Sequence, residues 1–124
     1  MKKIILLLIT VYLFGYEIKE FVTCKYVKNL TPINITTTFS TKDKRVYAFA
    51  YFKNIKIIKN IDFIWEKKVD NDWKLYADIK LPIYPGIRWR TYSYITIRPF
   101  FKGEWRVSIF DTNKTIKTIN FLIK

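Results

Sequence analysis

The 124-residue sequence contains no histidine, one cysteine and three glycines. Without histidine, the chain lacks the most frequent metal ligand and general base of proteins. A single cysteine, Cys24, excludes an intrachain disulfide and any zinc site built from several cysteines. Three scattered glycines form no glycine-rich loop of the kind that holds phosphates. We therefore expect neither a metal ion nor a cofactor.

Acidic residues are also few, ten in all. No two of them stand in the setting that paired-acid chemistry, such as glycoside hydrolysis, requires. Asp70 and Asp72 belong to a turn motif, where short side chains bond the backbone, and a calcium loop there would lack its bidentate glutamate. The sequence thus predicts no catalytic residue. An enzyme would need a concave pocket lined by two or more carboxylates.

Positive charge and aromatic residues, by contrast, are abundant. Lys and Arg number 23, the formal net charge is +13, and aromatic residues make up 19% of the chain. With 50% hydrophobic residues, the chain is too apolar to be disordered. Its length suits one domain with a sizeable core.

The N-terminus has the order of a signal peptide. Lys2 and Lys3 precede an apolar run of about a dozen residues, too short for the roughly 20 that a bilayer span needs, and Gly15 offers a small residue for cleavage. We expect a signal peptide over residues 1–15, a mature domain over 16–124, and a periplasmic or secreted location. The alternatives are a buried core strand and an uncleaved inner-membrane anchor. Cys24 lies too far from the apolar run for a lipoprotein site and is expected to be a half-buried strand residue.

After residue 20 the sequence alternates with period two and has turn motifs every 8–12 residues, which is typical of a β-sandwich or barrel. Asp70-Asn71-Asp72 and Asp111–Lys114 are predicted turns, and Pro82–Gly86 is expected to break a strand. The fold class predicted is an all-β, immunoglobulin-like antiparallel sandwich of seven or eight strands, and a closed barrel is the alternative. The predicted strands are Phe21–Val27, Ile33–Phe39, Val46–Phe52, Ile61–Lys67, Trp73–Leu81, Arg88–Ile97, Glu104–Phe110 and Ile116–Ile123.

Tryptophans and alternation also predict the core. Trp65 and Trp105 are the expected core anchors, and Trp89 is expected to point inward with them. Val46–Phe52 is apolar at both alternate sets of positions, so this strand is expected to be covered on both faces.

Several short motifs follow one another along the chain: Trp89–Ser93, Gly103–Val107 and Asp111, with Thr38–Ser40, Arg45–Phe49 and Trp65 upstream. In their order and spacing they resemble the uncharacterised bacterial domain-of-unknown-function (DUF) family twenty-nine-fourteen. The resemblance covers nearly all of the predicted mature chain. Members often have histidine at the position of Phe63, so any role of that histidine is absent here. The family commonly follows a signal or membrane segment and has no assigned activity, so the resemblance implies none.

Arginines cluster on two neighbouring predicted strands. Alternation puts Arg88, Arg90 and Tyr92 on one face, and Arg106 opposes the Trp105 face of the next strand. If the two strands pair, these four residues form one exposed platform that could bind carboxylate, phosphate or a sugar face. Alternatively, the arginines only cover aromatic rings on the outer sheet surface.

Charge and export together suggest a function. Loss of Lys2 and Lys3 with the leader lowers the formal charge from +13 to +11, which favours binding to anionic envelope polymers or lipids. Compositional bias toward lysine explains the same charge equally well. We expect a non-catalytic periplasmic binding or assembly module. The alternative is an interaction domain that recruits a periplasmic protein by β-strand addition. Export argues against nucleic acid.

The predicted turn Asp111–Lys114 also contains a modification motif. Asn113-Lys114-Thr115 is a glycosylation sequon with an acid, Asp111, two residues before the asparagine. Turn chemistry accounts for the same residues, so glycosylation of Asn113 and a purely structural turn are both open.

Overall fold

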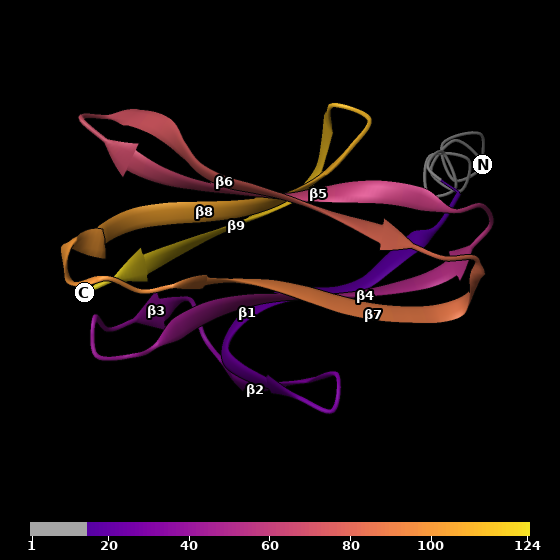
Figure 1. The fold of residues 1–124 in the computed structure, drawn as a ribbon, viewed down its shortest axis with the longest axis horizontal. Helices are drawn as coiled ribbons and strands as arrows, with labels where there is room; N and C mark the ends of the chain where they lie inside the picture. Colours follow the sequence, from indigo (N-terminus) through magenta and orange to yellow (C-terminus); the bar gives the residue numbers. More distant parts are fainter. Residues whose placement is uncertain (1–14) are drawn as a thin grey trace, which may run out of the picture.

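The computed structural model describes residues 15–124, which form two stacked β-sheets (Figure 1). The prediction of a signal peptide over residues 1–15 falls almost wholly outside this range. Within residues 15–124 no helix has the length and apolar character needed to cross a membrane. The strands are β1 (Glu17–Lys28), β2 (Thr31–Ile35), β3 (Thr38–Phe39), β4 (Arg45–Ile55), β5 (Lys59–Val69), β6 (Asp72–Ile83), β7 (Gly86–Thr96), β8 (Gly103–Asp111) and β9 (Lys114–Ile123).

The prediction of an all-β sandwich is confirmed. One sheet has the order β2-β1-β4-β7 and the other the order β3-β9-β8-β5-β6, and the two are not closed into a barrel. With β2 and β3 set aside, β1, β4 and β7 correspond to strands A, B and E of an immunoglobulin-like sandwich, and β5, β6, β8 and β9 to C, C′, F and G. All pairs are antiparallel except β3 with β9.

The predicted strand Ile33–Phe39 is two strands in different sheets. β2 pairs with β1, whereas β3 pairs with β9. Between them the Thr36 amide bonds the Thr23 carbonyl at 3.1 Å and the Thr36 hydroxyl bonds the Thr38 backbone. This threonine-rich link carries the chain across the sandwich edge, which is why the described chain has nine strands.

Turn residues lie where their backbone chemistry predicts, with one correction. Asp70 and Asn71 have φ values of 53° and 65°, and Thr112 and Asn113 have 52° and 64°, so both predicted hairpin turns are present. The break predicted within Pro82–Gly86 is present at Tyr84 and Pro85, but Pro82 itself does not break its strand, because β6 continues to Ile83. Since β6 is an edge strand, its proline can sit where no ladder hydrogen bond is needed.

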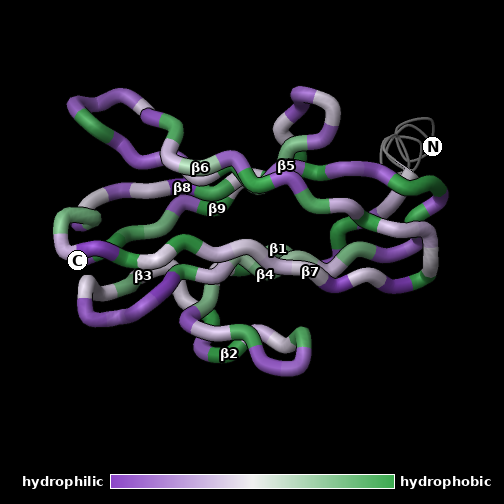
Figure 2. Tube along the Cα trace, in the orientation of Figure 1, coloured by the Kyte–Doolittle hydropathy of each residue, from purple (hydrophilic) through white to green (hydrophobic). Residues whose placement is uncertain are grey.

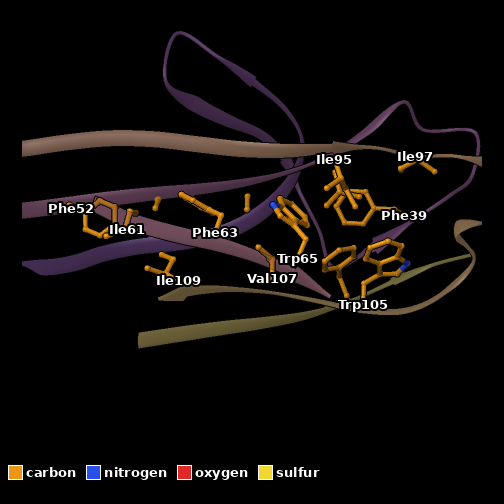
Figure 3. Packing of buried hydrophobic residues seen from close by; sticks show 14 of the residues in the cluster. Phe39, Phe52, Ile61, Phe63, Trp65, Ile95, Ile97, Trp105, Val107 and Ile109 are labelled. Carbon is orange, nitrogen blue, oxygen red and sulfur yellow. The ribbon is translucent and has the colours of Figure 1, made fainter. Parts of the chain in front are cut away.

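Hydrophobic and hydrophilic residues follow one another along the chain (Figure 2), and buried apolar side chains pack together between the sheets (Figure 3). Trp65 and Trp105 are 0% exposed and satisfy their indole N–H groups, Trp65 donating to Ser93 Oγ at 3.0 Å and Trp105 to the Phe101 carbonyl at 2.8 Å. Trp89 packs against the same core but is only partly buried, and its Nε1 has no hydrogen-bond partner.

Strand β4 is covered on both faces, as its sequence predicts. Val46, Ala48, Ala50 and Phe52 face the main core and are buried. On the other side, the hairpin of β1 and β2 projects beyond the four-stranded sheet (Figure 1) and encloses a second apolar cluster. That cluster contains Cys24, Val27, Tyr47 and Phe49. Cys24 is fully buried rather than half-buried.

Candidate functional site

The predicted site residues Arg88, Arg90 and Tyr92 lie together on β7, on the outer surface of the four-stranded sheet. Antiparallel pairing places Arg90 opposite Tyr51 and Tyr92 opposite Phe49 of β4, and directly opposed residues share a face. Because the intervening residues of β7 pack inward, the predicted alternation of this strand is correct. All three side chains are exposed.

Arg106 does not join them, so the prediction of a single four-residue platform is wrong. It lies on β8, which belongs to the five-stranded sheet, and its outward side is therefore the opposite surface of the sandwich. Residues 97–102, which include the 3₁₀ turn Pro99–Phe101, carry the chain from β7 to the other sheet rather than back along a hairpin. Arg106 instead donates from Nε to Glu66 Oε1 at 2.7 Å.

We call the outward-facing arginines and tyrosines of β4 and β7 the Arg/Tyr face. Its members are Arg45, Tyr47, Tyr51, Arg88, Arg90, Tyr92 and Tyr94. Two of its guanidinium groups rest on aromatic rings: Arg45 lies 4.3 Å above the Tyr94 ring centroid and Arg90 lies 4.2 Å above that of Tyr51. Stacking fixes each planar group while leaving N–H edges to bind an anion.

Arg45 is the site residue that the sequence argument missed. Its guanidinium is a cation at any working pH. Its Nη1 donates to the Tyr47 hydroxyl at 3.1 Å, and this bond raises the pKa of the guanidinium further above its usual value. The signal was present in Arg45-Val46-Tyr47, where period two places the arginine beside the tyrosine. It is recognised only once β4 is known to lie between β1 and β7.

A hollow of about 440 Å³ opens beside Arg45. It is lined by Lys25, Tyr26, Lys44, Arg45 and Tyr47. Lys25 has an exposed ion pair with Asp43 at 3.5 Å. In the part of the chain that the structure describes, no ion pair involves Arg45, Arg88 or Arg90. These three arginines are therefore cations without an ion-pair partner among the described residues, although Glu20 of β1 lies opposite Tyr51 in the same sheet.

A second hollow is lined by two carboxylates, as the pocket of an enzyme of the kind described above would be. It has about 560 Å³, lies on the five-stranded sheet, and is lined in part by Asp62, Asp78 and Lys80. Burial alone would raise the pKa of Asp62, but hydrogen bonds with Asp78 and Lys80 outweigh it and lower the pKa, while the bond to Asp62 raises that of Asp78. Lys80 Nζ lies 3.0 and 3.1 Å from the two oxygens of Asp62. The lysine thus neutralises one acid of the pair, and no catalytic role is shown.

Residues 15–124 contain no candidate metal site. The acidic residue of the predicted glycosylation motif, Asp111, is buried. No cluster of three acidic, cysteine or histidine side chains could hold a metal ion within residues 15–124. Asn113 is exposed at the β8–β9 turn, but Asp111 is 1% exposed. Its carboxylate accepts hydrogen bonds from Tyr16, Lys59 and Thr112. The acid of the extended sequon is therefore already engaged in the folded protein, and glycosylation of Asn113 stays a prediction.

Comparison with known protein families shows to which family the chain belongs. A family described as "Protein of unknown function (DUF2914)" matches residues 59–123. The chain belongs to the DUF2914 family. No curated protein matches it in sequence. The DUF2914 match runs from the first residue of β5 through β9. It includes Arg88, Arg90, Tyr92 and Arg106, but not Arg45 or the rest of the cationic hollow.

Solved structures share the fold of this DUF2914 protein. The β-glucosidase from Listeria innocua in complex with gluconolactone has a TM-score of 0.54 at 11% identity, covering 87% of this chain and 15% of that chain. The β-glucosidase from Kluyveromyces marxianus has a TM-score of 0.50 at 11% identity, covering 89% of this chain and 14% of that chain. The DUF2914 chain spans about 15% of the length of the first enzyme. At this identity the likeness shows a β-sandwich and carries no activity.

Proposed function

We propose that this protein is an exported, non-catalytic module that binds an anionic component of the cell envelope through the Arg/Tyr face. The observation that carries the proposal is the set of three arginines, Arg45, Arg88 and Arg90, which have no ion pair within residues 15–124. Export is supported by the charged, apolar and small residues that follow one another at the N-terminus.

The geometry suits a multivalent anion better than a single small ion. Arg45 and Arg90 are each held on a tyrosine ring, and the hollow beside Arg45 adds Lys25 and Lys44. Cations spaced along the strands of a sheet can contact successive phosphates or carboxylates of a polymer or membrane surface. Tyr92 and Tyr94, 38% and 41% exposed, add apolar area between them. Phosphate-rich lipopolysaccharide, anionic lipid headgroups and peptidoglycan acids all have this chemistry.

The test compares binding to three purified probes: lipopolysaccharide, peptidoglycan sacculi and liposomes containing phosphatidylglycerol. The variant Arg45→Ala/Arg90→Ala should bind at least about tenfold more weakly, because each lost charge-assisted hydrogen bond is worth about 1.5–3 kcal/mol. The matched control is Lys114→Ala/Lys117→Ala, which removes the same charge from exposed positions of β9 in the other sheet.

The control variant should keep its binding, and moderate salt should weaken the wild-type interaction. Equal losses in the two double variants would show that net charge alone drives binding, and would overturn the assignment to the Arg/Tyr face. Absence of binding to all three probes at low salt would overturn the proposal as a whole.

A second candidate function rests on the sheet edges. β6, twelve residues long, pairs only with β5, so one side of its backbone is available for an added strand. This candidate predicts a crosslinked protein partner whose capture is insensitive to salt. A Leu75→Lys change on β6, where Leu75 is 65% exposed, should lower that capture.

A further inference from the structure

The outer surface of the five-stranded sheet has a hollow that differs chemically from the Arg/Tyr face. Its volume is about 310 Å³, at the small end of the range for ligand pockets. Trp73 of β6 contributes a half-buried indole ring to it, far along the chain from Thr37 and Thr38 at the β3 edge. Glu104 and Asn120 also line it and supply its other polar side chains.

Trp73 is held in place by neighbours that do not line the hollow. The guanidinium carbon of Arg106 lies 4.3 Å from the centroid of the indole ring, and Arg106 is itself fixed by its 2.7 Å hydrogen bond to Glu66. Lys68 Nζ lies 5.8 Å from the same ring. A ring braced in this way is a preorganised apolar surface, which lowers the entropy cost of binding a ligand against it.

Polar groups surround that surface with both donors and acceptors. The Asn120 amide supplies two donors and an acceptor, Thr37 and Thr38 supply hydroxyls, and Glu104 supplies acceptors only. The Glu104 side chain is 65% exposed, and its Oε2 lies 3.8 Å from Lys68 Nζ. No arginine or lysine lines the hollow. The lining therefore favours an uncharged ligand rich in hydroxyl groups over an anion.

We propose that this hollow binds one uncharged pyranose ring of a glycan. The C–H groups on one face of such a ring pack against the negative face of an aromatic side chain, here the face of the Trp73 indole that Arg106 does not cover. Its equatorial hydroxyls then bond Asn120, Glu104 and the threonine hydroxyls, as expected of a small site with an aromatic wall and few polar groups. The site lies on the other sheet from the Arg/Tyr face and does not depend on it.

The test titrates the full ¹⁵N-labelled protein with cellobiose and with the disaccharide of N-acetylglucosamine, each to about 10 mM, because one ring in a shallow site implies millimolar affinity. Salt is kept high to suppress charge-driven binding. Saturable shifts are expected for the Trp73 indole and the Asn120 side-chain amide. The Trp65 indole, which is fully buried and does not line the hollow, should not move.

Two variants of Trp73 distinguish the loss of ring stacking from a general loss of structure. Trp73→Ala should weaken binding at least about tenfold, and Trp73→Phe should retain part of it because a smaller ring remains. Leu75→Ala is the matched control: Leu75 is exposed on the same strand and does not line the hollow. No saturable shift with either disaccharide, or equal binding by Trp73→Ala and the wild type, would overturn the proposal. The Arg45→Ala/Arg90→Ala variant should bind the disaccharides normally, so this site and the Arg/Tyr face can fail separately.

Discussion

Substituting Tyr16 or Asp111 should reveal a buried ionic clamp that joins the start of the described chain to the end of β8. The Tyr16 hydroxyl donates to Asp111 Oδ2 at 2.8 Å, Lys59 Nζ lies 3.0 Å from the same oxygen, and the Asp111 side chain is 2% exposed. Burial first, and then the bond to Asp111, raise the pKa of the Tyr16 phenol, so it stays a donor at any working pH.

Tyr16→Phe removes one hydrogen bond to a charged acceptor and keeps the ring, which packs edge-on against Phe52 at 5.3 Å. The expected loss in unfolding free energy is about 1.5–3 kcal/mol. Asp111→Ala removes the acceptor shared by Tyr16, Lys59 and Thr112, and the expected loss is about 3–5 kcal/mol, as for a broken buried ion pair. Urea unfolding monitored by tryptophan fluorescence measures both losses.

The pH dependence gives an independent check with Asp111→Asn. Burial would raise the pKa of Asp111, but hydrogen bonds from Lys59, Tyr16 and Thr112 outweigh it and lower the pKa. A lowered native pKa means that the stability gained is present above the unfolded value of about 3.9 and is lost as pH falls through the native value. The difference between wild type and Asp111→Asn should therefore shrink from pH 7 toward about pH 2. A difference that is constant over this range, or below about 0.5 kcal/mol at pH 7, would refute the clamp.

Three further outcomes follow from the structure. Trp105→Ala should lower the unfolding free energy by about 3–5 kcal/mol in urea titrations, because the indole is fully buried and its N–H is bonded. Trp89→Phe should stay within about 1 kcal/mol of wild type, since it removes a buried donor that lacks a partner, whereas Trp65→Phe also breaks the bond to Ser93 and should cost more. If Asn113 is glycosylated, the protein from its native host should exceed its sequence mass by a glycan that Asn113→Gln abolishes; an unmodified mass rejects this.

Local sequence pattern was sufficient to predict the layers of the fold. Period-two alternation gave the inward side of β7 and both faces of β4, because a strand repeats every two residues whatever it pairs with. The buried Trp65 and Trp105 followed from the same rule. The hairpin turns followed from Asx residues that tolerate positive φ.

The alternation within each strand could not predict which strands pair or in which sheet each strand lies. A short link joins β7 to β8, and a link of that length suits either a hairpin or a crossing between sheets, so the position of Arg106 could not be predicted. The Arg/Tyr face needed the pairing of β4 with β7, which is set by the whole fold rather than by either segment. Trp73 likewise reaches its hollow beside Asn120 only because β5 and β8 pair.

The switch of one segment between the two sheets affects how the protein can unfold. Residues 17–28 are bonded into one layer, and only a few residues later β3 is bonded to the last strand of the other. Reciprocal amide bonds between residues 39–41 and Lys124 secure that attachment. Neither layer can therefore peel away without straining the other, so the two should lose amide-exchange protection in a single cooperative event, and a ligand held by one surface slows the opening of both.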